Sequence, residues 1–360
     1  MIVTYLIYLF LLFLTCGTLF KLSFISYKYD EMIAFINNII TSSTLLFAII
    51  SSILRSIINP NINPILIYPF DFFTIIFMFP FFLAFHLLIY RERKRMKKDT
   101  NNLTELRVDA EGLRVLPLKY EIYRKLTHLI VICICFFYFI FGVFTKFLLD
   151  NFISILPDFI KNFFSGANLI ILNNVDFTQY LVVFLTSISL MGLLTADYVR
   201  IIAPEDYPLK SINRLLRQRE LKTRIGPHIT MAVGTISIVL IFGPLSNIGP
   251  LIVSLSILMS SVGDSSANLI GITIGCHKIR EGKKSYEGLI GGILFSFLSG
   301  IFFLIFQFFP NFISPQKILL ISLTVALIIG IIDYLDLPID DNLSFLITSS
   351  IIIYLLLQSF

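Results

Sequence analysis

Uninterrupted apolar runs recur along the whole 360-residue chain. A helix needs about 20 predominantly apolar residues to cross the roughly 30 Å hydrocarbon core of a bilayer, and these runs are that long. Composition agrees, because 56% of the residues are hydrophobic and only 14% are charged, whereas soluble domains carry about a quarter charged residues. Lipid offers the backbone no hydrogen-bond partners, so such runs must be helical. The sequence therefore predicts an all-α, polytopic integral membrane bundle.

The runs predict about ten transmembrane helices, at residues 2–20, 32–54, 65–90, 127–149, 178–202, 226–243, 248–275, 287–309, 317–334 and 343–360. The first run resembles a signal peptide, but no basic segment precedes its apolar part, which favours a retained helix. We expect residues 1–90 to form a three-helix membrane segment and residues 91–119 a basic cytosolic loop.

Lys and Arg are concentrated in three segments that ten spans place on one side. Eleven lie between residues 91 and 125, seven between 200 and 224, and four between 278 and 284. Because basic residues mark cytoplasmic loops, we predict that these segments are cytosolic and that both termini face the other way. The charges flank membrane spans, so topology explains them and no nucleic-acid partner is expected.

Two clusters of charged residues accompany the fourth and fifth predicted spans. Glu121, Arg124, Lys125 and His128 follow at spacings of three and four, so on a helix they share one face. Three potential cations there could hold phosphate oxygens, although a topogenic stop with an internal ion pair would use the same residues. Asp197 and Arg200 lie about one turn apart, which by itself predicts a helix-end ion pair.

A third cluster lies in the seventh span. Small residues repeat there every four positions, a stripe that lets another helix approach closely; they are Gly263, Ala267, Gly271 and Gly275. Close packing does not explain Asp264 one turn before Asn268. Such a pair of oxygen donors is suited to a divalent cation.

Polar residues also lie in two segments on the predicted cytosolic side, one before the eighth span and one between the ninth and tenth. Residues 282–288 form a basic, glycine-punctuated turn that fails the P-loop pattern but opens a helix, and helix N-termini attract anions. Between the ninth and tenth spans, four carboxylates lie within nine residues, at Asp333, Asp336, Asp340 and Asp341. Topology is set by Lys and Arg, so these carboxylates predict a metal-binding or base function. Together the clusters predict phosphoryl or nucleotidyl transfer to or from a lipid.

With these motifs, residues 120–345 resemble the polyprenol kinase family, which includes dolichol kinase and phytol kinase. The resemblance rests on the order of the Glu121–His128 motif, the Asp197/Arg200 pair, Gly263-Asp264 with its small-residue stripe, Lys284-Ser285-x-Glu287-Gly288, and Asp340-Asp341-Asn342. It implies that residues 120–360 are a catalytic membrane domain. It further implies transfer of the γ-phosphate of CTP, with Mg²⁺ or another divalent cation, to the hydroxyl of an isoprenoid alcohol in the bilayer.

Roles for individual residues follow from this resemblance. Asp264 and Asn268 would hold the metal, with Asp340 and Asp341 either sharing it or accepting the alcohol proton. Lys284, Arg124 and Lys125 would neutralise the triphosphate, and Glu287 and His128 would orient these groups. The remaining candidates for nucleotide binding are Arg200, Ser285, Gly288 and Asn342.

Three alternatives remain at this stage. The enzyme could be a CTP-dependent diacylglycerol kinase, or a cytidylyltransferase that makes a CDP-lipid. A transporter would also explain ten spans, but transporters place their binding residues near the bilayer midplane, whereas the charges here gather at the cytosolic ends. The host membrane would be the plasma membrane in a prokaryote or the endoplasmic reticulum in a eukaryote. The sequence indicates nothing about oligomeric state.

Overall fold

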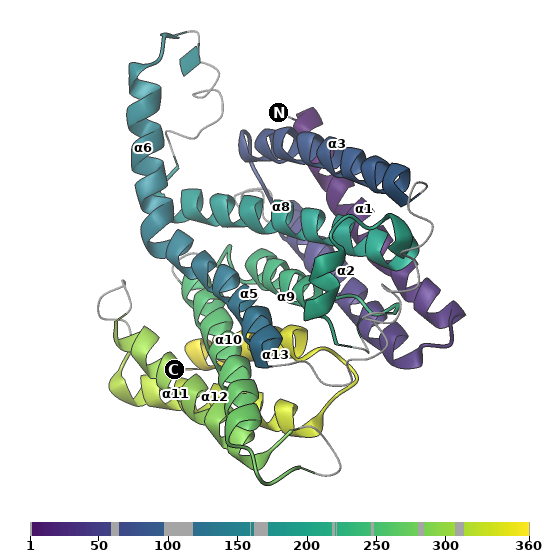
Figure 1. The fold of residues 1–360 in the computed structure, drawn as a ribbon. Coiled ribbons are helices and arrows are strands. Elements are labelled where there is room, and N and C mark those ends of the chain that lie inside the picture. Colours follow the sequence, from purple (N-terminus) through teal and green to yellow (C-terminus); the bar gives the residue numbers. More distant parts are fainter. Residues whose placement is uncertain are drawn as a thin grey trace.

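The computed structural model describes residues 2–58, 65–96, 118–158, 160–161, 172–217, 220, 222–245, 248–279, 284–306 and 313–359. Within these residues the protein is an all-α bundle (Figure 1), and its one extended feature is an isolated bridge between Lys278 and Ser285. The helices are α1 (Ile2–Lys28), α2 (Met32–Ile58), α3 (Phe70–Met96), α5 (Leu118–Phe136), η1 (Phe137–Phe141), α6 (Gly142–Ile155), α8 (Asn174–Ile202), η2 (Pro204–Asp206), η3 (Lys210–Leu215), α9 (Pro227–Ile241), α10 (Gly249–Thr273), α11 (Tyr286–Ile305), α12 (Pro315–Leu335) and α13 (Asp341–Gln358).

Each of the ten predicted spans corresponds to a helix, which confirms a polytopic membrane protein. Nine helical segments of the described chain are long and apolar enough to cross a bilayer. One of them is the continuous run of α5, a π-helical turn (η1) and α6, which covers 118–155 rather than the predicted 127–149. Residues 91–96 of the predicted basic loop continue α3, and residues 97–117 lie outside the described part.

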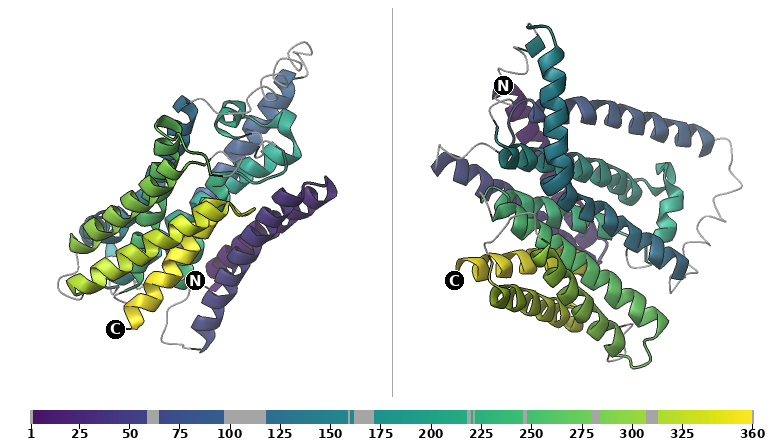
Figure 2. Two further views of the ribbon diagram at one scale, coloured as in Figure 1. Left: turned by 90° about the horizontal axis from the view of Figure 1, so that it is seen from below. Right: turned by 90° about the vertical axis from the view of Figure 1, so that its left-hand side faces the viewer.

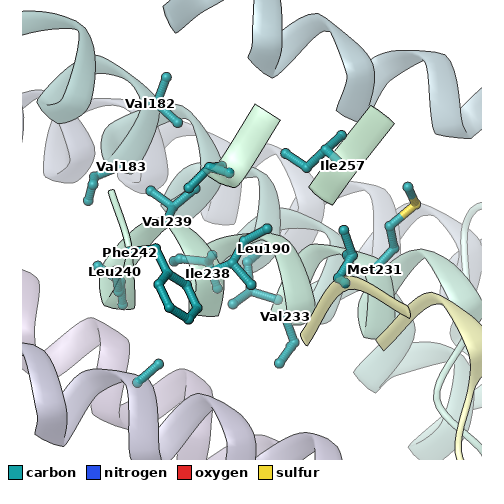
Figure 3. Close-up of a cluster of buried hydrophobic side chains, with 14 of the residues drawn as sticks. Val182, Val183, Leu190, Met231, Val233, Ile238, Val239, Leu240, Phe242 and Ile257 are labelled. Atoms are coloured by element: carbon teal, nitrogen blue, oxygen red, sulfur yellow. The ribbon is translucent and has the colours of Figure 1, made fainter. Parts of the chain in front are cut away.

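Helix α9 forms the centre of the bundle. It packs against α2, α8 and α13, and at 15 residues it is only about 22 Å long, too short for a 30 Å core. Most of its residues are buried. Figure 3 shows its side chains, among them Val233, Ile238 and Val239, together with Val183 and Leu190 from α8.

Capping residues fix where several helices begin. Side-chain oxygens of Asn173, Ser285, Ser314 and Asp340 accept backbone N–H groups in the first turns of α8, α11, α12 and α13. Such bonds satisfy donors that have no partner within the helix. The last of these caps brings Asp340 to the start of α13, next to the cavity described below.

The predicted small-residue stripe is confirmed as a helix contact, and the approaching helix is α11. A Cβ atom on Gly288 would lie 2.6 Å from the carbonyl oxygen of Ala267, and one on Gly271 would lie 3.3 Å from Ser285 Oγ. Farther along, a Cβ on Gly292 would meet Ala267 Cβ at 2.8 Å. Glycines on both helices therefore allow α11 to begin directly beside the polar part of α10.

Helix ends gather at one side of the bundle, which we call the polar end. The C-terminal parts of α3, α8, α10 and α12 meet the N-terminal parts of α5, α9, α11 and α13 around one cavity there. Ion pairs between Lys222 and Glu31 (2.8 Å) and between Arg93 and Asp206 (2.7 Å) join segments at this end. The antiparallel arrangement can be followed in Figure 2. It agrees with the predicted alternation of the spans.

Candidate functional site

A cavity of about 2070 Å³ opens at the polar end. Its walls carry all of the predicted site residues except Glu287 and Arg200; those that line it are Arg124, Lys125, His128, Asp264, Asn268, Lys284, Ser285, Gly288, Asp340, Asp341 and Asn342. Residues from α5, α10, α11 and α13 thus converge although they are far apart in sequence. The cavity also has an apolar part between α3, α5 and α8.

The charged face of α5 meets α10 in a buried ion pair. Lys125 Nζ lies 2.5 Å from Asp264 Oδ2, and both side chains are largely buried. His128 Nδ1 lies 3.6 Å from the same carboxylate oxygen. Within the described chain, this buried His128 nitrogen has no hydrogen-bond partner. Buried polar atoms rarely lack a hydrogen bond, and His128 belongs to the cavity wall, so its Nδ1 is a candidate to bond a ligand there.

Farther toward the start of α5, four charged groups form a network. Arg217 donates from Nε and Nη2 to Glu121 Oε1, each at 3.1 Å. Arg124 lies 3.3 Å from Glu121 Oε2 and 3.5 Å from Glu220 Oε1. Although partial burial opposes its charge, Glu121 and Glu220 hold the pKa of Arg217 above the ordinary value. Two guanidinium groups are therefore fixed at the cavity wall and carry positive charge.

On the opposite wall, Lys284 is surrounded by carboxylates. Its Nζ lies 2.9 Å from Asp333 Oδ1, 3.3 Å from Asp336 Oδ1 and 3.4 Å from Asp341 Oδ2, and it also donates to the carbonyl oxygen of Asp333 at 2.8 Å. Burial opposes its charge, but Asp341 and Asp333 outweigh this effect and raise the pKa of Lys284. The group is thus a fixed cation held by three acidic side chains.

Asp340 and Asp341 have different surroundings although they are adjacent. Asp340 Oδ1 accepts hydrogen bonds from the backbone N–H and the side-chain amide of Asn342, at 3.1 and 2.8 Å, and Oδ2 lies 3.9 Å from Arg224. Within the described chain, the charged partner of Asp341 is Lys284. The Asp340 carboxylate is therefore largely engaged in capping, whereas Asp341 has more capacity to bind a ligand.

Arg200 does not line the cavity, and its predicted part in nucleotide binding is not supported. Its Nε donates to Asp197 Oδ1 at 2.5 Å, and its Nη1 and Nη2 donate to the carbonyl oxygens of Glu220 and Arg224 at 2.7 and 2.9 Å. Asp197 also accepts the backbone N–H of Gly226 at 3.0 Å. Every nitrogen of the guanidinium group therefore has an acceptor. These bonds hold the segment before α9 against the end of α8.

Glu287 lies beside the cavity rather than in its wall. Its Oε1 is 2.5 Å from His277 Nδ1 and 3.1 Å from the His277 backbone nitrogen. Among the described residues its contacts therefore belong to the turn between α10 and α11, and none is with a cavity cation, so its predicted orienting role stays a prediction. Ser285 lines the cavity, but its Oγ accepts the Gly288 N–H as the cap of α11. The intervening loop residues 280–283, including the predicted Gly282 and Lys283, lie outside the described chain.

Sequence reasoning left several polar residues at this end out of the site. Arg217 and Glu220 were only part of a basic run with no helical period, so nothing in the sequence connected them with Glu121. Asn37 and Asn38 of α2 are fully buried and lie within the residues that carry none of the family motifs. A usable signal did exist, since buried polar residues in an apolar helix usually have a structural or functional partner.

The oxygen donors fit a divalent cation that is bound together with phosphates. Among the described residues, no three His, Cys, Asp or Glu side chains come together as a closed metal site. Asp264 and Asn268 nevertheless face the same cavity from adjacent turns of α10, and Asp341 faces it from α13. Mg²⁺ usually takes only one or two protein carboxylates and completes its shell with water and substrate phosphates.

A scan against protein-family models finds no match to the chain. Searches against curated proteins and against solved structures find no match either.

Proposed function

We propose that the protein is a membrane-embedded lipid kinase that transfers the γ-phosphate of CTP to the hydroxyl of a polyprenol-type alcohol, giving the polyprenyl phosphate and CDP. The observation that carries the proposal is the cavity itself. Fixed cations, hard oxygen donors and a histidine nitrogen that makes no hydrogen bond within the described chain line one part, and apolar side chains line the other. Transfer of a phosphate to a lipid alcohol requires a charged part that binds the phosphates and an apolar part that binds the hydrocarbon chain. The choice of CTP and of an isoprenoid rests on the family resemblance.

The residues could divide the reaction as follows. Lys125, Lys284 and Arg124 would neutralise the phosphates, because catalysis of phosphoryl transfer is mainly positioning and charge stabilisation. The alcohol oxygen forms a bond to the γ-phosphorus while the bond to the β–γ bridging oxygen breaks and CDP leaves. Asp341 accepts the alcohol proton, since Asp340 is held in its cap.

Binding of Mg²⁺ would involve Asp264 and Asn268. When bound, the ion would neutralise charge on the transferring phosphate. His128 Nδ1, which makes no hydrogen bond within the described chain, would bond a phosphate oxygen. The polar end would then face the cytosol, where the nucleotide is, in accordance with the basic segments beside it.

Labelled nucleotide tests this proposal. Protein purified in mild detergent with Mg²⁺ is offered mixed polyprenols and diacylglycerol, with CTP that is labelled at the α- or the γ-phosphate. We expect label in the lipid fraction from γ-labelled CTP only, and chromatography of the product identifies the alcohol. Phosphatidic acid as the product would indicate a diacylglycerol kinase, and transfer of α-label a cytidylyltransferase. Transfer of neither label, under conditions in which a related kinase works, would overturn the proposal.

A further inference from the structure

The apolar part of the cavity is an elongated groove, which we call the chain arm. The cavity is lined on α3 from Phe77 to Leu88, on α8 from Leu185 to Ala196, and on α5 and η1 from Arg124 to Phe137. At 1.5 Å per residue, each stretch is about 16–20 Å long. The arm is therefore longer than half the thickness of a 30 Å hydrocarbon core.

Away from Arg124, Lys125 and His128, most side chains in the walls of the arm are apolar. Phe77, Phe81 and Phe85 of α3 face the cavity, as do Ile130 and Ile134 of α5. The rings of Phe81 and Phe85 stack with centroids 5.9 Å apart. An apolar cavity of this kind binds hydrocarbon in preference to water.

The arm is accessible from the side of the bundle. Within the described residues, which do not include 97–117, α3 packs mainly against α1 and α8 and α5 mainly against α10, while both helices line the cavity. Phe77 and Ile130, on the two sides, remain 59% and 71% exposed. Because these positions lie within membrane-spanning segments, the surrounding medium is lipid. A ligand can enter the arm from the bilayer without passing through water.

Gly192 of α8 leaves space in the arm beside the ring of Phe81. A Cβ atom at this position would lie 3.5–3.8 Å from ring carbons of Phe81, and both residues line the cavity. A larger side chain at 192 must project against the Phe81 ring. Gly192 and Phe81 therefore face each other across the arm, in contact distance of a side chain at position 192.

We infer that the chain arm binds the hydrocarbon chain of the acceptor alcohol, with its hydroxyl toward Asp264 and Asp341 and with Gly192 and Phe81 selecting for chain shape. The inference rests on the proposed function only in taking the ligand to be that alcohol. It follows from continuity, since the same cavity holds the charged residues and the arm. The charged end of the cavity is suited to the polar head of a ligand, and the arm is suited to its apolar chain.

A photoreactive probe tests binding without requiring catalysis. The probe is a long-chain prenyl alcohol with a diazirine at the chain end, irradiated with the full-length protein in detergent and without nucleotide. We expect labelled peptides from α3, α5 and α8. Gly192→Leu should reduce labelling by about tenfold, the equivalent of two methylenes that lose their burial. Gly17→Leu is the matched control, because a Cβ at Gly17 meets nothing within 4 Å.

The outcomes separate this inference from the proposed kinase activity. If Gly192→Leu removes the labelling of the arm and Gly17→Leu retains it, the inference that the arm binds the hydrocarbon chain is supported, even if no phosphate is transferred from CTP. If phosphate is transferred but the label lies elsewhere, or Gly192→Leu labels normally, the arm is not the chain site. Competition by a phospholipid as effective as that by unlabelled prenol would also overturn it, because the arm would then be a general lipid-facing groove. In a kinase assay, Gly192→Leu should raise KM for long-chain alcohols more than for short ones and leave nucleotide KM unchanged.

Discussion

Asn37 Oδ1 accepts a hydrogen bond from the backbone N–H of Asp340 at 2.8 Å, across 303 positions of sequence. The same oxygen lies 3.3 Å from Arg224 Nη2, and Asn37 is fully buried. A single amide on α2 thus supports both the cap of α13 and an arginine next to Asp340. Helix α2 is therefore part of the framework of the candidate site, although residues 1–90 contain none of the predicted site residues.

Removal of the Asn37 amide should destabilise the protein. Asn37→Ala leaves the Asp340 N–H without its acceptor in a buried position, which costs about 1–3 kcal/mol. We expect a lower midpoint of thermal unfolding in detergent, whereas Asn37→Asp, which retains an acceptor and faces Arg224, should recover most of the loss. Asn151→Ala, exposed on α6, is the control and should have little effect. An Asn37→Ala protein as stable as the wild type would show that this bond contributes nothing.

Substitution of Asp264 should affect stability and turnover separately. Asp264→Asn leaves Lys125 buried without its counter-ion, which costs about 3–5 kcal/mol, and it also removes the proposed metal ligand. The double variant Lys125→Met/Asp264→Asn removes the uncompensated charge and should recover stability in thermal unfolding. Phosphate transfer should remain abolished in both. Near-normal transfer in either variant would exclude Asp264 from the reaction.

Arg200 should be important for folding and not for nucleotide binding. Arg200→Lys removes the planar guanidinium group that donates to Asp197 and to two backbone carbonyl oxygens. A lysine ammonium cannot make the same set of hydrogen bonds. We expect a stability loss of about 1–3 kcal/mol in unfolding experiments and an unchanged nucleotide KM for the folded fraction. A raised KM with normal stability would instead return Arg200 to the nucleotide site, as the family resemblance implies.

The sequence was sufficient for the helices and for the shared face of α5. Apolar length alone locates the spans, and the period of an α-helix puts Glu121, Lys125 and His128 on one side. The sequence did not predict the hydrogen-bond partners of Arg200 and Asp340, because these include backbone groups, which every residue has. The contact between Asn37 and Asp340 depends on how α2 packs beside α9 and α13, and no local pattern encodes that arrangement.

The contact between α10 and α11 can be tested with one methyl group. Gly288→Ala would put a Cβ 2.6 Å from the Ala267 carbonyl oxygen, a backbone atom that cannot rotate away. Overpacking of this kind costs about 1–3 kcal/mol, so we expect a lower unfolding midpoint. Gly17→Ala, with open space around it, provides the comparison. If Gly288→Ala is no less stable than Gly17→Ala, the two helices are not packed as closely as this contact requires.

Lys284 should contribute to stability over a defined pH range. Its folded-state pKa is raised, because Asp341 and Asp333 outweigh the opposing effect of burial. A raised pKa means that the stabilisation is complete below the ordinary lysine value of about 10.4 and is lost as pH rises through the folded-state value. The difference in unfolding free energy between wild type and Lys284→Met should therefore stay constant from above neutral pH to about 10.4 and shrink at higher pH.

The same variant tests the proposed role of Lys284 with phosphates. Lys284→Met should raise the nucleotide KM more than it lowers kcat, since a fixed cation that neutralises phosphate acts first on binding. Lys28→Met, exposed at the end of α1, controls for the loss of one positive charge. A stability difference that already declines near neutral pH would contradict the carboxylate cluster around Lys284. An unchanged nucleotide KM would instead leave that cluster a structural one and remove Lys284 from the phosphate site.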